Sequence, residues 1–135
     1  MPFTTTTTVR FADVDPAGIV FYPRYFEMLN GAVEDWFAKD LGLNFATMHL
    51  KNRIGVPTVK LETEFLSPSE LGDTLEIHIL PRSLGRTSCA FDALFTGAGR
   101  DRLKASVVLV CMDLDTQRPV QWPAAVREAI AETLV

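Results

Sequence analysis

One long helical pattern followed by a series of strand patterns limits the folds open to this 135-residue chain. From Pro23 to Leu41, apolar residues recur at steps of three and four, which is the periodicity of an amphipathic helix, and Gly42 is a natural stop signal. A helix of about 18 residues would be roughly 27 Å long, so it must be a central element of a short chain. Strand-like runs follow, separated by turns rich in Gly, Pro, Ser or Asp, at residues 56–65, 73–80, 87–95 and 103–113.

The remaining segments complete a single domain, predicted over residues 1–135. The β-branched threonine run at 4–8 predicts a first strand, residues 44–53 predict a connector or short helix, and residues 123–134 predict a closing helix. Strands joined by short turns favour an antiparallel meander, so we predict an α+β fold in which the long helix packs on a curved antiparallel sheet of about five strands.

Two further predictions concern burial. Residues 107–110 are apolar at both odd and even positions, so both faces of a strand formed there would be apolar, which predicts a strand buried on both faces. Because one helix covers only one face of such a sheet, a second copy of the chain is expected to protect the remaining edge and surface.

Composition excludes several classes of protein. The formal net charge is −4 and no basic run occurs, which argues against nucleic acid as a partner. No apolar run approaches the ~20 residues of a membrane span. The first eleven residues have neither the charged nor the apolar region of a secretory signal, so we expect a cytoplasmic protein.

The cysteines and histidines do not suggest a metal or redox site. Cys89 and Cys111 lie in strand-like runs, away from any histidine and outside a C-x-x-C motif, so we interpret them as buried reduced thiols. His49 and His78 are isolated and lack metal-ligand spacing. No metal and no organic cofactor is implied.

The candidate site lies in the acidic loop before the long helix. Asp13, Asp15 and Gly18 are close together there, and Tyr22-Pro23 marks the start of the helix, where proline is favoured. Free backbone N–H groups at a helix start can polarise a carbonyl oxygen while a nearby carboxylate acts on the carbonyl carbon or on water. Aspartate is also common in turns, so a purely structural role stays open for both carboxylates.

The run DVDPAGIVFYPRY, residues 13–25, resembles the signature of the hotdog-fold acyl-CoA thioesterases. It is most similar to the 4-hydroxybenzoyl-CoA thioesterase type. The related YbgC-like branch shares the acidic loop but usually carries histidine where this chain has Pro23. The resemblance continues through the long helix, a G-x-P step at residues 55–57 and the strands that follow.

This resemblance implies an acyl-CoA thioester hydrolase that acts at the interface of a homodimer or of a homotetramer built from two dimers. Asp15 would be the catalytic carboxylate, either as nucleophile or as general base on water. The backbone N–H of Tyr22 would bond the thioester carbonyl, assisted by the helix macrodipole. Gly18 would permit a positive φ or a close backbone approach, and Asp13 is expected to be a structural hydrogen-bonder.

The substrate-binding residues depart from the family pattern. An aspartate that meets the ring hydroxyl in 4-hydroxybenzoyl-CoA enzymes is replaced here by Asn30, whose neutral amide can donate or accept. The acyl group is therefore a different aromatic acid or an aliphatic one. For the CoA phosphates the resemblance points to Arg86 and, less directly, Arg82, although the neighbours Gly85 and Thr87 are not basic.

Two other functions stay open. A thioesterase for an acyl carrier protein would need a basic docking surface, which the acidic composition does not favour. A non-catalytic acyl-CoA-binding module is the second alternative, and the presence of Asp15 argues against it.

Overall fold

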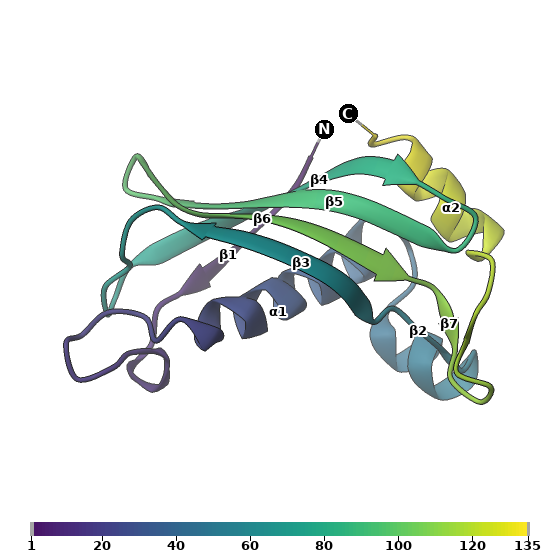
Figure 1. Cartoon of the computed structure of the whole chain (residues 1–135), viewed down its shortest axis with the longest axis horizontal. Helices are drawn as coiled ribbons and strands as arrows, with labels where there is room; N and C mark the ends of the chain where they lie inside the picture. Colours follow the sequence, from purple (N-terminus) through teal and green to yellow (C-terminus); the bar gives the residue numbers. More distant parts are fainter. Residues whose placement is uncertain (1, 135) are drawn as a thin grey trace.

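The computed structural model describes residues 2–134, in which five antiparallel strands form one sheet and a long helix lies across one face (Figure 1). The order in the sheet is β1-β4-β5-β6-β3. Its strands are β1 (Phe3–Thr8), β3 (Thr58–Phe65), β4 (Thr74–Leu84), β5 (Ser88–Gly97) and β6 (Arg100–Val110). A small second sheet contains β2 (Ile54–Gly55), β7 (Met112–Asp113) and β8 (Arg118–Pro119). The helices are α1 (Pro23–Lys39) and α2 (Ala124–Ala131), with a 3-10 turn η1 (Phe11–Asp13) and a π-helical turn η2 (Thr47–Lys51). The predicted α+β architecture is confirmed.

Helix α1 forms where the sequence predicted it. Pro23 occupies its first turn, and the chain leaves the helix through Gly42, which has a positive φ of 73°. The buried stripe follows helical spacing and consists of Tyr25, Leu29, Ala32, Val33, Trp36 and Phe37. Tyr25 rather than Phe26 begins this stripe, and Phe26 is turned to the flank of the helix, where it is half-buried.

Aromatic contacts join α1 to the sheet. The Trp36 ring lies 5.8 Å from that of Phe91 on β5, and the Tyr25 ring lies 5.7 Å from that of Phe95. Burying a large apolar side chain of this kind contributes about 1.5–3 kcal/mol. The core therefore holds α1 firmly against β5, in the middle of the sheet.

The predicted meander is correct for β4, β5 and β6 but wrong for β3. Strand β3 pairs with β6, in the register Lys60↔Val108 and Leu61↔Val107, and not with β4, the next strand in the chain. The far side of β4 is taken by β1, with Thr4 opposite His78, so β3 is placed beyond β6. As a result β3 is an edge strand, and nearly all of its side chains are exposed.

Among the local expectations, two are confirmed and one is corrected. The first strand was expected at residues 4–8 and is found at Phe3–Thr8. Strand β6 is not buried on both faces: Val107 and Leu109 are buried, whereas Val108 and Val110 on the opposite face are half-buried. The connector contains the short helical turn η2. Among the described helices, none has the length and apolar character required to cross a membrane.

Candidate active site

The acidic loop between η1 and α1 is a closed turn. The Asp15 N–H donates to the Ile19 carbonyl at 2.9 Å, and the Gly18 N–H donates to the Asp15 carbonyl at 2.9 Å. Gly18 has a φ of 80°, a region that residues with a Cβ seldom adopt, so the predicted need for glycine here is confirmed. The turn fixes the backbone from which the Asp15 side chain extends.

The two carboxylates of the loop have different partners. Asp13 Oδ2 accepts the Arg10 N–H at 2.8 Å, which is the structural role expected for this residue. Asp15 Oδ1 accepts the Ala17 N–H at 2.8 Å, and its Oδ2 has no hydrogen-bond partner within residues 2–134. Asp15 is half-buried. One of its carboxylate oxygens is thus held in place while the other remains available.

The backbone N–H of Tyr22 lies at the start of α1. Within the described part of the chain it donates to no acceptor, and the next residue, Pro23, has no N–H to compete with it. The positive end of the helix macrodipole is at this point. The Tyr22 side chain is 59% exposed and packs edge-on against Phe21 and Phe65. An anionic oxygen placed here would be stabilised by both the donor and the dipole.

The acidic loop is tied to the segment between β3 and β4. The Val20 N–H donates to the Ser69 carbonyl at 2.9 Å, and the Leu71 N–H donates to the Gly18 carbonyl at 3.0 Å. Each of the two segments therefore donates one backbone hydrogen bond to the other. The position of Asp15 therefore depends on how firmly residues 66–73 are held.

That segment is held by Arg102, whose side chain is almost completely buried. Its guanidinium donates to Asp73 Oδ2 at 2.8 Å, to Ser69 Oγ at 3.1 Å and to the Gly97 carbonyl at 2.9 Å. Tyr25 on α1 donates its hydroxyl to the same Ser69 Oγ at 3.0 Å. The pKa of Asp73 is held below its ordinary value mainly by the hydrogen bond from Arg102 and secondly by the hydrogen bond from the Glu70 backbone N–H. Sequence reasoning missed this network, because Arg102 lies in the charged run RDRLK, which has the character of a solvated turn.

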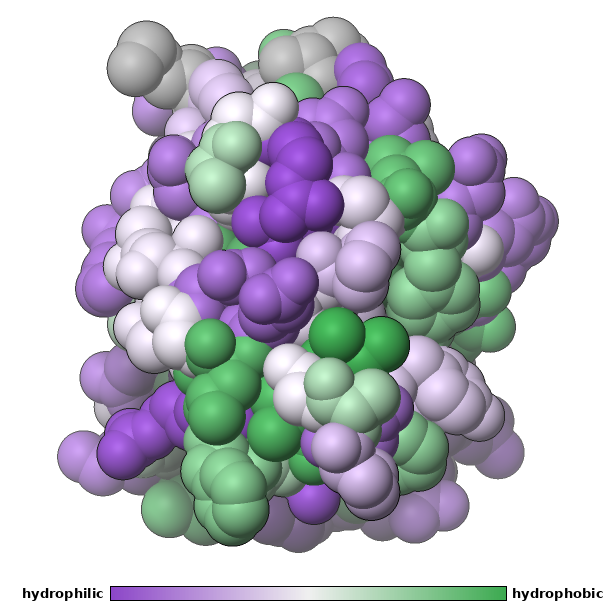
Figure 2. Space-filling model, turned by 90° about the vertical axis from the view of Figure 1, so that its left-hand side faces the viewer, coloured by the Kyte–Doolittle hydropathy of each residue, from purple (hydrophilic) through white to green (hydrophobic). Residues whose placement is uncertain are grey.

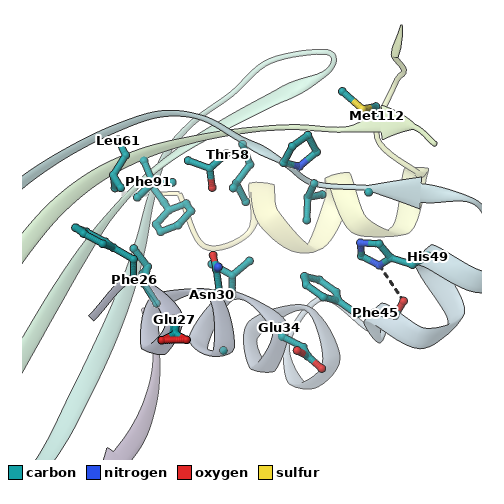
Figure 3. A pocket seen from close by; sticks show the side chains of 18 of the residues that line it. Phe26, Glu27, Asn30, Glu34, Phe45, His49, Thr58, Leu61, Phe91 and Met112 are labelled. Atoms are coloured by element: carbon teal, nitrogen blue, oxygen red, sulfur yellow. Dashed lines mark hydrogen bonds between the residues drawn. The ribbon is translucent and has the colours of Figure 1, made fainter. Parts of the chain in front are cut away.

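A groove of about 890 Å³ runs along the flank of α1, between this helix and strands β3 and β6 (Figure 3). Phe26 lies near one end, and Phe45 and His49 lie at the other. Asn30 extends from α1 towards the strand side, where Thr58 contributes to the lining. The other lining residues are mainly apolar: Leu29, Val33, Val56, Pro57, Leu61, Phe91, Val107, Leu109, Met112 and Leu114.

The predicted site residues fall into three places. Asp15 and Gly18 are joined by a backbone hydrogen bond in the loop before α1, and Tyr22 stands at the start of that helix. Asn30 lines the groove, and it is eight residues after Tyr22, which corresponds to about 12 Å along the helix axis.

The arginines lie elsewhere. Arg82 pairs with Asp92 at 2.7 Å, and Arg86 is exposed in the β4–β5 turn beside α2, at the opposite end of the molecule from the acidic loop (Figure 1). One chain alone does not bring either arginine to Asp15.

The loop end of the molecule exposes several large apolar side chains. In the view of Figure 2, hydrophobic groups gather in the lower half and along one side, among polar neighbours. The exposed apolar residues of this region include Phe11, Phe21, Tyr22, Phe65 and Leu66. Apolar surface concentrated beside a candidate site indicates that a ligand or another chain covers it.

The cysteines are not part of the site. Cys89 and Cys111 are buried and unpaired, as predicted, and burial raises the pKa of each thiol to about 11. His78 bridges Thr4 and Thr96 across β1, β4 and β5, which is a structural role. Within residues 2–134, no cluster of three or more His, Cys, Asp or Glu side chains is arranged to hold a metal ion.

Comparison with known proteins identifies the family. A model described as the thioesterase-like superfamily matches residues 9–130. A 1,4-dihydroxy-2-naphthoyl-CoA hydrolase from Thermosynechococcus vestitus is 29% identical over 117 residues, which cover 86% of this chain and 80% of the relative. A solved gentisyl-coenzyme A thioesterase has a TM-score of 0.84 at 27% identity, covering 93% of this chain and 99% of that structure.

A third similarity concerns the fold alone. The solved 1,4-dihydroxy-2-naphthoyl-CoA thioesterase of Synechocystis has a TM-score of 0.88 at 22% identity, with 98% of this chain and 97% of that structure covered. The family model matches most of this chain, and the chain folds as one long helix across a five-stranded antiparallel sheet. The chain therefore belongs to the thioesterase-like superfamily of hotdog-fold thioester hydrolases.

Proposed function

We propose that this protein hydrolyses an aromatic acyl-CoA thioester, with Asp15 as the reacting carboxylate and the Tyr22 N–H as the donor to the thioester carbonyl. The observation that supports the proposal is that a carboxylate oxygen of Asp15 and the backbone N–H of Tyr22 both lack intramolecular partners in residues 2–134, in a loop that leads directly into α1. The resemblance of the acidic loop to known thioesterases supports the same roles.

Two routes are compatible with this arrangement. Asp15 Oδ2 can take a proton from water, so that the hydroxide attacks the thioester carbon and the C–S bond breaks to release CoA. Alternatively Oδ2 attacks the carbon itself, which expels CoA thiolate and leaves a mixed anhydride that water then cleaves. In both routes negative charge develops on the carbonyl oxygen, where one well-placed donor is worth about 3 kcal/mol.

Labelled water can detect the anhydride route. In a single turnover in ¹⁸O-water, attack of water on the Asp15 side of the anhydride would leave ¹⁸O in the peptide that contains Asp15. The general-base route, like attack of water on the acyl side of the anhydride, places the label only in the released acid, so label in the peptide is the diagnostic result. Mass spectrometry of the digested enzyme is the measurement.

An aromatic acyl group is the substrate class that suits the groove. Phe26, Phe45 and Phe91 line it, and aromatic rings pack favourably against one another in edge-on or offset arrangements. Relatives with the same fold are named for dihydroxynaphthoyl and gentisyl thioesters of CoA. We assign Asn30 to the acyl group, because it is the uncharged polar side chain that α1 contributes to the lining, between Glu27 and Glu34.

We also propose that the working enzyme contains at least two copies of the chain. Strand β3 is an exposed edge, and its Leu61 and Thr58 side chains form one wall of the groove. A second copy paired along β3 would bring another acidic loop and another set of arginines to this region. The roles predicted for Arg82 and Arg86 towards CoA therefore depend on assembly, because within one chain they lie far from Asp15.

A thiol-release assay tests the proposal. The purified protein would be assayed with benzoyl, hydroxybenzoyl, naphthoyl and aliphatic CoA esters, beside the variants Asp15→Asn and Asp40→Asn. Asp40 is an exposed carboxylate that follows the other end of α1, so its substitution should leave the rate unchanged. Asp15→Asn is expected to abolish turnover while it still binds substrate. Binding of an ester without hydrolysis by the wild-type protein would indicate a non-catalytic acyl-CoA-binding module instead.

A further inference from the structure

The end of the groove furthest from Phe26 contains a histidine whose role the sequence did not reveal. His49 lies on η2, where its ring packs on that of Phe45 with 4.8 Å between ring centres. Gly55 of β2 lies beside it: a Cβ built on Gly55 would be 3.6 Å from His49 Nε2. The ring is half-buried, and it closes this end of the groove in Figure 3.

The hydrogen bond of His49 fixes its tautomer. Nδ1 lies 2.9 Å from the Phe45 carbonyl oxygen, the contact marked by a dashed line in Figure 3. A carbonyl oxygen only accepts, so the proton of the neutral ring must be on Nδ1. Nε2 then carries a lone pair and is an acceptor.

That acceptor has no donor within residues 2–134. His49 is also linked to Arg53, whose guanidinium donates to the His49 backbone carbonyl at 3.5 Å. The groove residues around the ring are largely apolar and include Val56, Met112 and Leu114. An acceptor in such surroundings gains free energy when a ligand brings a donor to it, and a ligand without a donor leaves it unsatisfied.

We propose that His49 Nε2 is the acceptor for a hydroxyl group on the acyl moiety, and that it makes the enzyme selective for hydroxylated aromatic thioesters. The proposal rests on the function proposed above, because it takes the groove as the acyl site. The apolar walls would hold the ring system, Asn30 would meet a polar atom in its middle, and His49 would meet the hydroxyl at its far end. Glu27 and Glu34 are exposed on the helix side of the opening, so they are less suited to a buried hydroxyl.

A pair of substitutions isolates the acceptor. Asparagine at position 49 can place its amide nitrogen near the position of Nδ1 and keep the bond to Phe45, but it has no atom near Nε2. Glutamine extends its amide to the region of Nε2 and can still accept. His49→Asn should therefore remove the preference and His49→Gln should retain part of it.

The measurement is the ratio of kcat/KM for two matched substrates, 6-hydroxy-2-naphthoyl-CoA and 2-naphthoyl-CoA, with 4-hydroxybenzoyl-CoA and benzoyl-CoA as a shorter pair. The wild-type ratio should exceed one for at least one pair, and His49→Asn should lower that ratio about 3- to 10-fold, the range expected for loss of one neutral hydrogen bond. The rate with the unsubstituted ester should change little. Equal ratios in the wild-type protein and in His49→Asn would overturn the proposal.

A binding measurement keeps this test separate from that of the proposed function. In the background of Asp15→Asn, the Kd of each ester would be determined by calorimetry with histidine or asparagine at position 49. A 3- to 10-fold loss of affinity confined to the hydroxylated ester supports the role of His49 even if the wild-type protein hydrolyses nothing. Equal losses for both esters, or no loss, would contradict it.

Gly55→Ala provides a second test that leaves His49 intact. The new Cβ would come within 2.8 Å of the flexible end of Leu114, which can move, and would crowd the space beside Nε2. We expect the same loss of preference for the hydroxylated ester as in His49→Asn. An unchanged preference would show that the hydroxyl does not approach Nε2 from the side of Gly55 and would count against the proposed contact.

Discussion

The donor at the start of α1 belongs to the backbone, so side-chain substitution at Tyr22 should not remove it. Tyr22→Phe keeps the N–H and the ring contacts with Phe21 and Phe65, and we expect kcat within about twofold of the wild-type value. Replacing the Tyr22 amide by an ester, which exchanges N–H for oxygen, should lower kcat by about 10²- to 10³-fold, as for the loss of one oxyanion donor. Steady-state kinetics of the two proteins check this, and similar kcat values would remove Tyr22 from the site.

At this scale the sequence was informative only for residues whose partners are near in the chain. Asp15 and Gly18 are hydrogen-bonded to each other within one turn, Tyr22 follows four residues later at the helix start, and the turn chemistry is visible in the sequence. Asn30 was singled out by the family resemblance, and the structure places it in the lining of the groove. His49 could not be found in this way, because its place in the groove depends on the packing of η2 against β2.

At the scale of elements, the buried Arg102 connects the end of the sheet to the acidic loop. Arg102→Leu removes the buried partner of the ion pair with the half-buried Asp73 and takes away the side-chain donor to the Gly97 carbonyl, while Ser69 keeps the Tyr25 hydroxyl. We expect the free energy of unfolding to fall by about 1–3 kcal/mol, because Asp73 is partly exposed and water can solvate its charge. Arg100→Leu, an exposed change two residues away, should be within about 0.5 kcal/mol of wild type. Urea denaturation measures both, and equal stability of the two variants would show that the network is not important for stability.

The same network predicts a dependence of stability on pH. Arg102 lowers the pKa of Asp73 in the folded protein below the ordinary value of 3.8, which it regains on unfolding. As the pH falls, the unfolded chain takes up this proton first, so the stabilisation is present above the ordinary pKa and is lost as the pH passes through the lower, folded-state pKa.

Asp73→Asn should therefore be less stable than the wild-type protein at pH 7, and this difference should shrink as the pH is lowered below 4. Unfolding curves at pH 7, 5, 4 and 3 provide the measurement. A constant difference between the two proteins over this range would contradict the assignment.

The elements themselves were largely predictable, but the position of β3 was not. Its alternating pattern identified a strand, and the turn after it suggested a hairpin with β4. Pairing with β6 depends on β1, which occupies the free side of β4 and is more than sixty residues away in the chain. Local patterns carry no information about such a choice, and so the groove between β3 and α1 could not be foreseen.

For the molecule as a whole, the exposed edge strand predicts self-association. If a two-fold axis passed near Leu61, antiparallel pairing of two β3 strands would place Lys60 opposite Glu62 of the second copy on both sides of the axis. We expect a mass of two or four times the 15.0 kDa chain in analytical ultracentrifugation.

Val59→Lys introduces a charge on this strand and should weaken the assembly and reduce activity together. Leu134→Lys, at an exposed apolar position beyond α2, is the matched control and should change neither. A wild-type protein that sediments as a 15.0 kDa species at micromolar concentration would rule out association through β3.

The pairing of β3 with β6 also affects the order in which the protein can fold. Helix α1 and the β4–β5 hairpin need only contacts between neighbouring segments, whereas β3 must wait for residues 103–109 before it has a partner. Long-range strand pairing is slow, so the groove is expected to form late in folding. For the same reason it can form only after residues 103–109 have been synthesised. A ligand of the groove would then bind only the finished molecule. It should slow unfolding and raise the melting temperature without accelerating folding.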